Sequence, residues 1–130
     1  MKHATFFSLL TLLVMLPVFV GAATAGNVTP DEAYSMINER DGLYLLDVRT
    51  PGEFQQARLD GARLIPIDQL VQRLPELPKG RPILVYCAVG SRSAQVVNYL
   101  ARQGYLEVYN LYGGIYAWAQ KGYPVLRGGS

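Results

Sequence analysis

The sequence predicts a small α/β domain whose mostly parallel sheet is covered by helices on both faces. Short apolar runs typical of strands alternate along the chain with segments of helical pattern. Strands separated by helices need crossover connections, which join parallel strands. The 130 residues leave room for one compact domain, and the chain shows no internal repeat or long linker.

The N-terminal segment is not expected to belong to this domain. A short basic start at residues 1–3 precedes Phe6–Val20, which is almost entirely apolar, and the small residues Ala23–Ala25 follow. This order is that of a secretory signal peptide, with cleavage expected after Ala25. We therefore predict a signal peptide over residues 1–25 and a mature domain over residues 26–130.

An uncleaved membrane anchor is the alternative for this segment, because about 20 apolar residues are enough to span a bilayer. The small residues before Gly26 favour cleavage, since a signal peptidase requires them and an anchor does not. Cleavage predicts a periplasmic or secreted protein. Membrane association is expected only if the segment is retained.

The first half of the predicted domain begins with two capped helices and a strand between them. Residues 29–32 (Thr-Pro-Asp-Glu) predict a capping box that opens a helix, and Asp41–Gly42 ends it. Residues 50–53 repeat the cap for a shorter helix. Residues 43–48 are apolar on both faces, which predicts a central strand.

The middle of the chain predicts shorter elements. Residues 62–65 form a brief second strand, and residues 68–74 form one or two helical turns. We expect Leu70, Val71 and Leu74 to face the core from these turns.

The second half predicts two more strands, each followed by a helix. Residues 83–86 are the most strand-like run and end at Cys87, and residues 108–111 form the last strand. A helix over residues 91–103 follows the first, and a helix beginning at Gly113–Gly114 follows the second. The predicted buried side of the longer helix consists of Ala94, Val97, Leu100 and Ala101.

Composition excludes several classes of function. Twelve basic and ten acidic residues give a net charge of +2, which provides no footprint for nucleic acid. The single cysteine, Cys87, excludes an internal disulfide and a cysteine-cluster metal site. The single histidine, His3, lies in the segment predicted to be removed, so histidine-dependent triads and histidine-ligated zinc are excluded from the mature chain. We expect no metal and no cofactor.

Cys87 is the predicted reactive residue, because ligand sites in open α/β sheets lie beyond the carboxyl ends of the strands. The turn into the next helix leaves backbone N–H groups free, and Gly90 allows the loop to curl so that they form an anion-binding nest. The helix N-terminus and Arg92 also favour the thiolate. We expect an ionised thiol with access to solvent. The alternative is a small buried apolar cysteine.

Cys87, Gly90, Arg92 and Ser93 form the pattern C-x-x-G-x-R-S, which resembles the active-site loop of rhodanese sulfurtransferases. Three further segments resemble this family in the same order, namely residues 47–54 (D-V-R-x-x-x-E-F), 61–66 (G-A-x-x-I-P) and 113–118 (G-G-x-x-x-W). The stretch before the second of these lacks the histidine usual in the family. The resemblance covers nearly the whole predicted mature chain.

The resemblance implies a rhodanese-like fold and transfer of a sulfane sulfur through a persulfide on Cys87. The donor would be a small anion such as thiosulfate, and the acceptor a thiol or cyanide. The predicted donor-binding residues are Arg92, Arg49, Ala88, Val89, Gly90 and Ser91. A planar guanidinium can hold two donor oxygens, although Arg49 could instead pair structurally with Glu53.

Two other functions fit parts of the pattern. Cysteine phosphatases of related fold have C-x5-R, whereas Cys87 and Arg92 form the shorter C-x4-R. A phosphate group needs a wider loop than a single sulfur atom, so phosphoryl transfer is disfavoured, and hydrolysis of p-nitrophenyl phosphate would reveal it. A non-catalytic module, or a carrier that relays persulfide sulfur to a partner, remains open.

Overall fold

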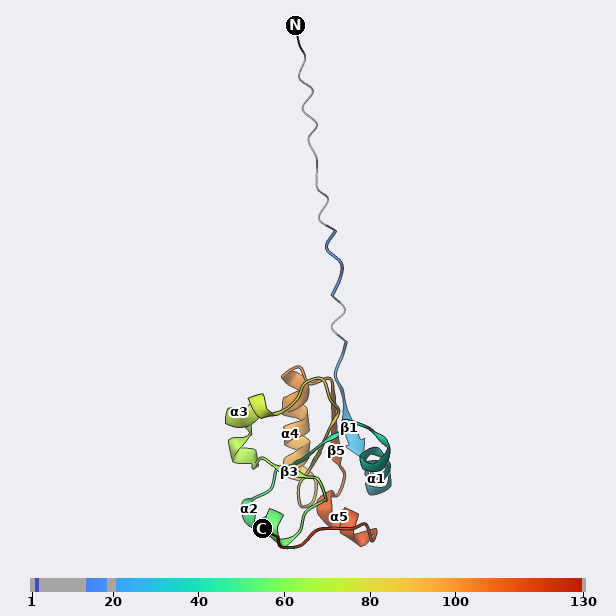
Figure 1. The fold of residues 1–130 in the computed structure, drawn as a ribbon, viewed down its shortest axis with the longest axis vertical. Coiled ribbons are helices and arrows are strands. Elements are labelled where there is room, and N and C mark those ends of the chain that lie inside the picture. The colour runs from blue at the N-terminus through green and yellow to red at the C-terminus, as the bar shows by residue number, and fades with distance from the viewer. Residues whose placement is uncertain (1, 3–13, 19–20, 130) are drawn as a thin grey trace.

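The computed structural model describes residue 2, residues 14–18 and residues 21–129 (Figure 1). The predicted signal peptide falls mostly outside these residues, including the greater part of its apolar run. Within the ranges that are described, no helix has the length and apolar character needed to cross a membrane.

A single sheet of five strands forms the centre of the domain. The strands are β1 (Thr24–Val28), β2 (Tyr44–Asp47), β3 (Arg63–Leu64), β4 (Ile83–Tyr86) and β5 (Glu107–Leu111). Their order is β1-β5-β4-β2-β3, and each pairing between them is parallel. The predicted parallel sheet is confirmed. All four residues of β4, the middle strand, are buried, as a strand covered on both faces requires.

Helices cover both faces of this sheet, as predicted (Figure 1). They are α1 (Pro30–Glu39), α2 (Pro51–Gln56), α3 (Leu70–Arg73), α4 (Ser91–Arg102) and α5 (Gly114–Gln120). Leu70 of α3 and Leu100 of α4 belong to one apolar cluster, and Ala33 of α1 and Trp118 of α5 belong to the other. The sheet therefore separates two cores.

The two predicted capping boxes are confirmed. Thr29 accepts a hydrogen bond from the Glu32 N–H, and the Glu32 carboxylate accepts one from the Thr29 N–H. Thr50 and Glu53 make the same reciprocal pair at the start of α2. Each box satisfies two N–H groups that a helix start would otherwise leave unpaired.

Two details of the predicted core are wrong. Val71 is 67% exposed, because α3 has only four residues between 3-10 turns and does not hold a helical stripe through residues 67–76. On α4, Val96 is buried and Ala94 is only half-buried, while Val97 and Leu100 face the core as predicted.

Strand β1 was not predicted from the sequence. Its residues, Thr-Ala-Gly-Asn-Val, lack the alternation of a half-buried strand, and only Val28 is buried. The strand forms because β5 offers it an edge, with Thr24 opposite Glu107 and Ala25 opposite Val108. The predicted cleavage site after Ala25 therefore falls inside β1, and cleavage there would leave residues 26–28 to pair with β5.

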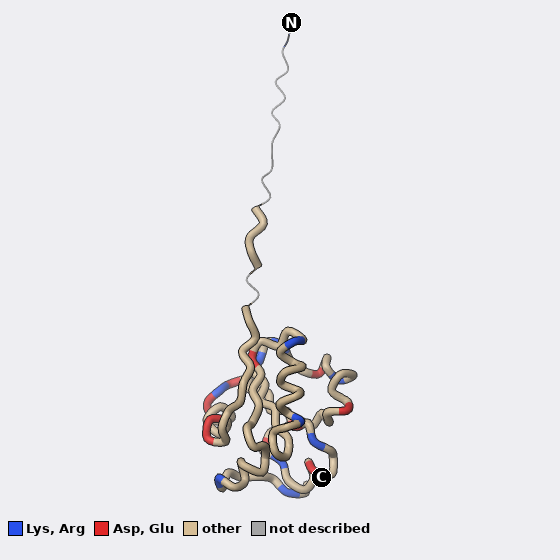
Figure 2. Tube along the Cα trace, turned by 180° about the vertical axis from the view of Figure 1, so that it is seen from behind, with Lys and Arg blue, Asp and Glu red and all other residues tan. Residues whose placement is uncertain are grey.

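Charged residues of both signs are distributed over the helices and loops around the sheet (Figure 2). Exposed ion pairs join distant segments, including Arg40 with Glu107 and Lys121 with Asp31. Such surface pairs each contribute about 0–1 kcal/mol. The apolar clusters on the two faces of the sheet therefore account for most of the stability.

Candidate active site

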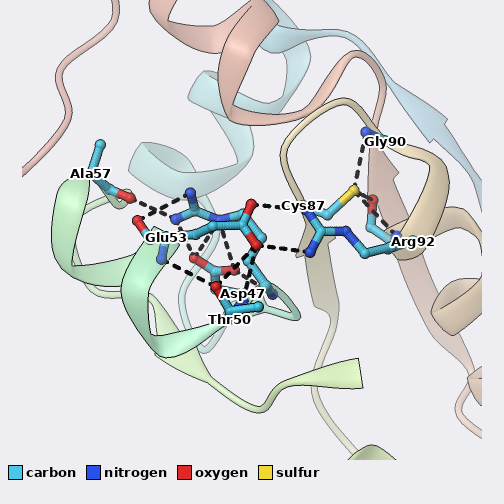
Figure 3. A network of polar contacts seen from close by, with 9 residues as sticks. Asp47, Thr50, Glu53, Ala57, Cys87, Gly90 and Arg92 are labelled. Carbon is cyan, nitrogen blue, oxygen red and sulfur yellow. Dashed lines mark hydrogen bonds and ion pairs between the residues drawn. The ribbon is translucent and has the colours of Figure 1, made fainter. Parts of the chain in front are cut away.

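The candidate site lies at the carboxyl edge of the sheet, where sequence reasoning placed it. Cys87 follows β4, the central strand, and Asp47 ends the neighbouring strand β2, directly beside Tyr86. The Gly113–Gly114 pair follows β5 on the other side. Because the strands are parallel and adjacent, segments far apart in the sequence meet at this edge, where the Asp47 and Glu53 carboxylates lie beside the loop that carries Cys87 (Figure 3).

The sulfur of Cys87 accepts three hydrogen bonds. The Gly90 N–H donates at 3.1 Å, the Ser93 N–H at 3.4 Å and the Ser93 hydroxyl at 3.2 Å. Since α4 begins at Ser91, the Ser93 N–H belongs to the first turn, whose donors have no partner within the helix. The sulfur therefore occupies the place of a helix-capping acceptor, where the helix dipole favours negative charge.

Two glycines allow the loop to take this shape. Gly90 has φ +97°, a left-handed conformation that turns its N–H toward the sulfur. Gly114 lies so close to the loop that a Cβ there would collide with the carbonyl of Ala88. The close approach lets the first N–H groups of α5, those of Ile115 and Tyr116, donate to the carbonyls of Cys87 and Ala88. Helix α5 thus holds the loop from outside.

The pKa of the Cys87 thiol lies below its ordinary value. Burial opposes ionisation, but hydrogen bonds outweigh it, first from the hydroxyl and N–H of Ser93 and then from the N–H groups of Gly90 and Val89. The side chains of Val89 and Ser91 are exposed and make no hydrogen bond to the sulfur. Ser93 is absent from the predicted site residues, and its hydroxyl is the functional group that sequence reasoning missed.

Replacing Ser93 by alanine should raise the pKa of Cys87, because the largest opposing effect to burial is the hydroxyl hydrogen bond. A hydrogen bond to a charged group contributes about 1.5–3 kcal/mol, so the acid dissociation constant of the thiol should fall roughly tenfold or more. Thiolate absorbance measured against pH reports this directly. Ser91→Ala, an exposed serine of the same loop, is the matched control and should leave the curve unchanged.

The thiol is more covered than the sequence led us to expect. Cys87 is 0% exposed, which corrects the expectation of a thiolate open to solvent. It is nevertheless not an ordinary apolar cysteine, because three polar donors converge on its sulfur. A reagent must displace part of the surrounding loop or its charged neighbours to reach the sulfur.

Arg92 is the cation that the sequence places in the loop beside this thiol. Its guanidinium donates two hydrogen bonds to the carboxylate of Glu53, at 2.8 and 2.9 Å, and the side chains are 34% and 30% exposed (Figure 3). These bonds raise the pKa of Arg92, and a Cys87 thiolate raises it further. The guanidinium and a Cys87 thiolate thus attract each other, but a carboxylate already neutralises Arg92.

Arg49 does not face the thiol, contrary to its predicted role in donor binding. The residue is 4% exposed, and its guanidinium donates to both carboxylate oxygens of Asp47 at 2.7–3.1 Å. It also donates to the backbone carbonyls of Glu53 and Ala57. The alternative of a structural role is supported, with Asp47 rather than the Glu53 carboxylate as the partner.

The Glu53–Arg92 pair should make stability depend on acidity. Hydrogen bonds from Arg92 are the largest cause that lowers the pKa of Glu53 from 4.5 to about 2. Its contribution is therefore complete above about pH 4.5 and is lost as the pH falls toward 2. Glu53→Gln keeps a capping box but removes the titrating group, so its unfolding free energy should vary less over this interval. Urea titrations at several pH values measure the difference.

Among the residues that the structure describes, no cluster of His, Cys, Asp and Glu side chains could hold a metal ion.

Comparison with known proteins gives a consistent relationship. Residues 29–121 match the rhodanese-like domain. A sulfurtransferase of Allochromatium vinosum is 41% identical over 88 residues, covering 68% of this chain and 82% of the relative. Thiosulfate sulfurtransferase GlpE of Coxiella burnetii is 32% identical over 87 residues, covering 67% of this chain and 80% of the relative.

Solved structures agree with this relationship. The rhodanese-related protein of Thermoplasma volcanium superposes with a TM-score of 0.70 at 32% identity, covering 77% of this chain and 96% of the other. The same relationship is supported by the four sequence motifs, the parallel sheet and the cysteine loop at its carboxyl edge. This chain belongs to the family of rhodanese-like domains, and sulfurtransferases are among its relatives.

Proposed function

We propose that this protein is a sulfurtransferase that moves a sulfane sulfur from thiosulfate, or a similar small anionic donor, to a thiol or cyanide through a persulfide on Cys87. One observation carries the proposal, namely that the sulfur of the sole cysteine is held by three hydrogen-bond donors. Such a setting stabilises a thiolate, which is the nucleophilic form of cysteine. The sulfurtransferases among its relatives support the reaction class.

The reaction has two displacement steps at sulfur. The Cys87 thiolate attacks the outer sulfur of thiosulfate, the S–S bond of the donor breaks, and sulfite leaves with the bonding electron pair. An acceptor thiolate or cyanide then attacks the outer persulfide sulfur, and the Cys87 thiolate leaves. Neither step needs a general base once the thiol is ionised, and ping-pong kinetics are expected.

The groups around the sulfur support both steps. The N–H groups of Gly90 and Ser93 and the Ser93 hydroxyl stabilise the thiolate that begins the cycle and re-forms at its end. Of the six predicted donor-binding residues, Arg92 is the cation that can reach the donor oxygens, provided that it shares or releases Glu53. Arg49 is not part of this proposal, because its guanidinium is buried and paired with Asp47.

Opposite substitutions in the Glu53–Arg92 pair should shift thiosulfate affinity in opposite directions. Arg92→Ala should raise the KM for thiosulfate by about tenfold, because one charge-assisted contact with the donor is lost. Glu53→Gln should lower it, because the guanidinium is no longer neutralised. Steady-state kinetics with cyanide as acceptor measure both constants. If neither KM moves, Arg92 is not a donor contact.

Intact mass spectrometry tests the proposed cycle. Incubation with thiosulfate should add the mass of one sulfur atom to the protein, and cyanide should then remove it. Cys87→Ser should show neither change. A wild-type mass that stays constant in thiosulfate would overturn the proposal for this donor.

A persulfide carrier with slow turnover is the second candidate. The full burial of Cys87 favours it, because a covered thiol exchanges slowly with small molecules. Turnover measured with thiosulfate and several thiol acceptors separates the two functions. A carrier should form the persulfide once and pass it on at rates far below those of an enzyme.

Export to the periplasm or the medium is also part of the proposal. The same mass measurement reports N-terminal processing of the exported protein. Cleavage after Ala25 should give a mature chain that begins at Gly26, with β1 shortened by the residues opposite Glu107 and Val108. A mass that retains residues 1–25 would instead support the membrane anchor.

A further inference from the structure

Asn110 is an unusual residue for its place in the fold. It lies on β5, is 3% exposed, and is flanked on the strand by residues such as Val108 and Leu111 that are fully buried and apolar. Its side-chain oxygen is buried and, among the described residues, has no hydrogen-bond partner. A buried polar atom without a partner destabilises a fold, so stability alone does not explain an asparagine here.

The amide nitrogen of the same side chain is fully used. It donates to the side-chain oxygen of Asn27 at 2.9 Å and to the backbone carbonyl of Gly90 at 3.3 Å. Asn27 is the residue of β1 directly opposite Asn110 in the sheet. The Gly90 carbonyl can only accept, so the nitrogen of the Asn110 amide must lie on that side, and the Asn27 side-chain oxygen accepts the other N–H.

Gly90 is the loop residue on which these contacts act. Its N–H donates to the Cys87 sulfur, while its carbonyl accepts from the Asn110 amide and from the Ala94 N–H of helix α4. Glycine adopts many backbone conformations, so Gly90 has little intrinsic preference for the left-handed one that it takes here. Contacts at the carbonyl therefore limit how the residue can rotate.

We propose that Asn110, oriented by Asn27, is a positioning residue that holds the Gly90 carbonyl and thereby keeps the Gly90 N–H directed at the Cys87 sulfur. Asn110 touches neither the sulfur nor a substrate, and its effect passes through one residue of the loop. Edge strand β1 in this way becomes part of the active site. The inference rests on the proposed function, in which Cys87 carries the sulfur.

The positioning role predicts that Asn110→Leu keeps or raises the free energy of unfolding while it makes the Cys87 thiol less acidic. Asn110→Leu removes the unpartnered oxygen and keeps a branched side chain, and the cavity of about 220 Å³ that Asn110 lines beside β1 leaves room for the larger methyl groups. The protein should therefore be at least as stable to urea as the wild type. The Gly90 carbonyl loses a donor, and the acid dissociation constant of the Cys87 thiol should fall by about three- to tenfold. A merely structural asparagine would not produce this combination.

Thiolate absorbance against pH, with the Cys87→Ser spectrum subtracted to remove the tyrosines, measures the effect without any sulfur donor. Asn27→Leu should give a smaller shift in the same direction. The double variant should titrate like Asn110→Leu alone, because Asn27 acts through Asn110. Asn98→Leu is the matched control, since Asn98 lines the same cavity of about 220 Å³ beside β1 and is exposed.

Each outcome decides the inference. A stable Asn110→Leu variant whose thiol titrates like that of the wild type would overturn it. If Asn110→Leu does not fold, Asn27→Leu decides, and a titration equal to that of Asn98→Leu overturns the inference. Should wild-type protein form no persulfide while Asn110→Leu still shifts the titration, the proposed function fails and the positioning role stands.

Discussion

Cys87→Ser is expected to abolish sulfur transfer. The chain has one cysteine, and the proposed cycle passes through a covalent bond to its sulfur, so no other residue can replace it. A serine hydroxyl in the same cradle stays protonated at neutral pH and cannot hold a sulfane sulfur. Thiosulfate:cyanide activity should fall by on the order of a thousandfold or more, and the mass increment should disappear.

The fold should survive this change, because serine is close to cysteine in size and its oxygen can accept the same hydrogen bonds. Unfolding in urea checks that lost activity is not lost structure. Ser91→Ala is the control for the loop, since this exposed serine makes no hydrogen bond to the sulfur and alanine keeps the backbone N–H that a donor could contact. Substantial sulfur transfer by a folded Cys87→Ser protein would end the proposal.

Arg49→Ala is expected to cause a large loss of stability rather than a change in donor binding. The substitution leaves the carboxylate of Asp47, which is 0% exposed, without its cationic partner. Breaking a buried ion pair in this way costs about 3–5 kcal/mol in the free energy of unfolding. Two backbone carbonyls, of Glu53 and Ala57, also lose a donor.

Arg92→Ala is the matched comparison, because its pair with Glu53 is about one-third exposed. That substitution should cost about 1 kcal/mol or less. Asp47→Asn combined with Arg49→Met should recover part of the stability lost in Arg49→Ala, since no uncompensated charge stays buried. If Arg49→Ala is as stable as the wild type and only raises the KM for thiosulfate, Arg49 binds the donor after all.

Much of the fold could be read from local patterns. Capping boxes at Thr29 and Thr50 involve residues three positions apart, and the central strand before Cys87 is an unbroken apolar run. Each of these patterns lies within a few consecutive residues, so it can be recognised in the sequence alone. Strand β1 was missed for the complementary reason, because its sequence has no strand pattern and its conformation comes from pairing with β5.

The candidate site was predictable in part. The loop from Cys87 to Ser93 and its amide nest follow from a strand that ends beside a helix start, and the structure has that arrangement. The role of Arg49 was not predictable, because whether a guanidinium faces a substrate or a buried carboxylate depends on how its loop packs. The complete burial of the thiol likewise depends on packing, and no short stretch of the sequence indicates it.

The pairing of Arg92 shows most clearly how a local sequence pattern differs from a contact made only in the folded chain. A short stretch of the sequence is enough to predict a thiol at the carboxyl end of a strand, followed by a glycine and a helix whose first N–H groups are free. Glu53 and Arg92 are 39 positions apart, and they meet because β2 lies beside β4 in the sheet. Strand order arises from the burial of whole faces, so no short segment encodes it, and the contacts of Arg92 with Glu53 and of Asn110 with Asn27 exist only in the folded arrangement.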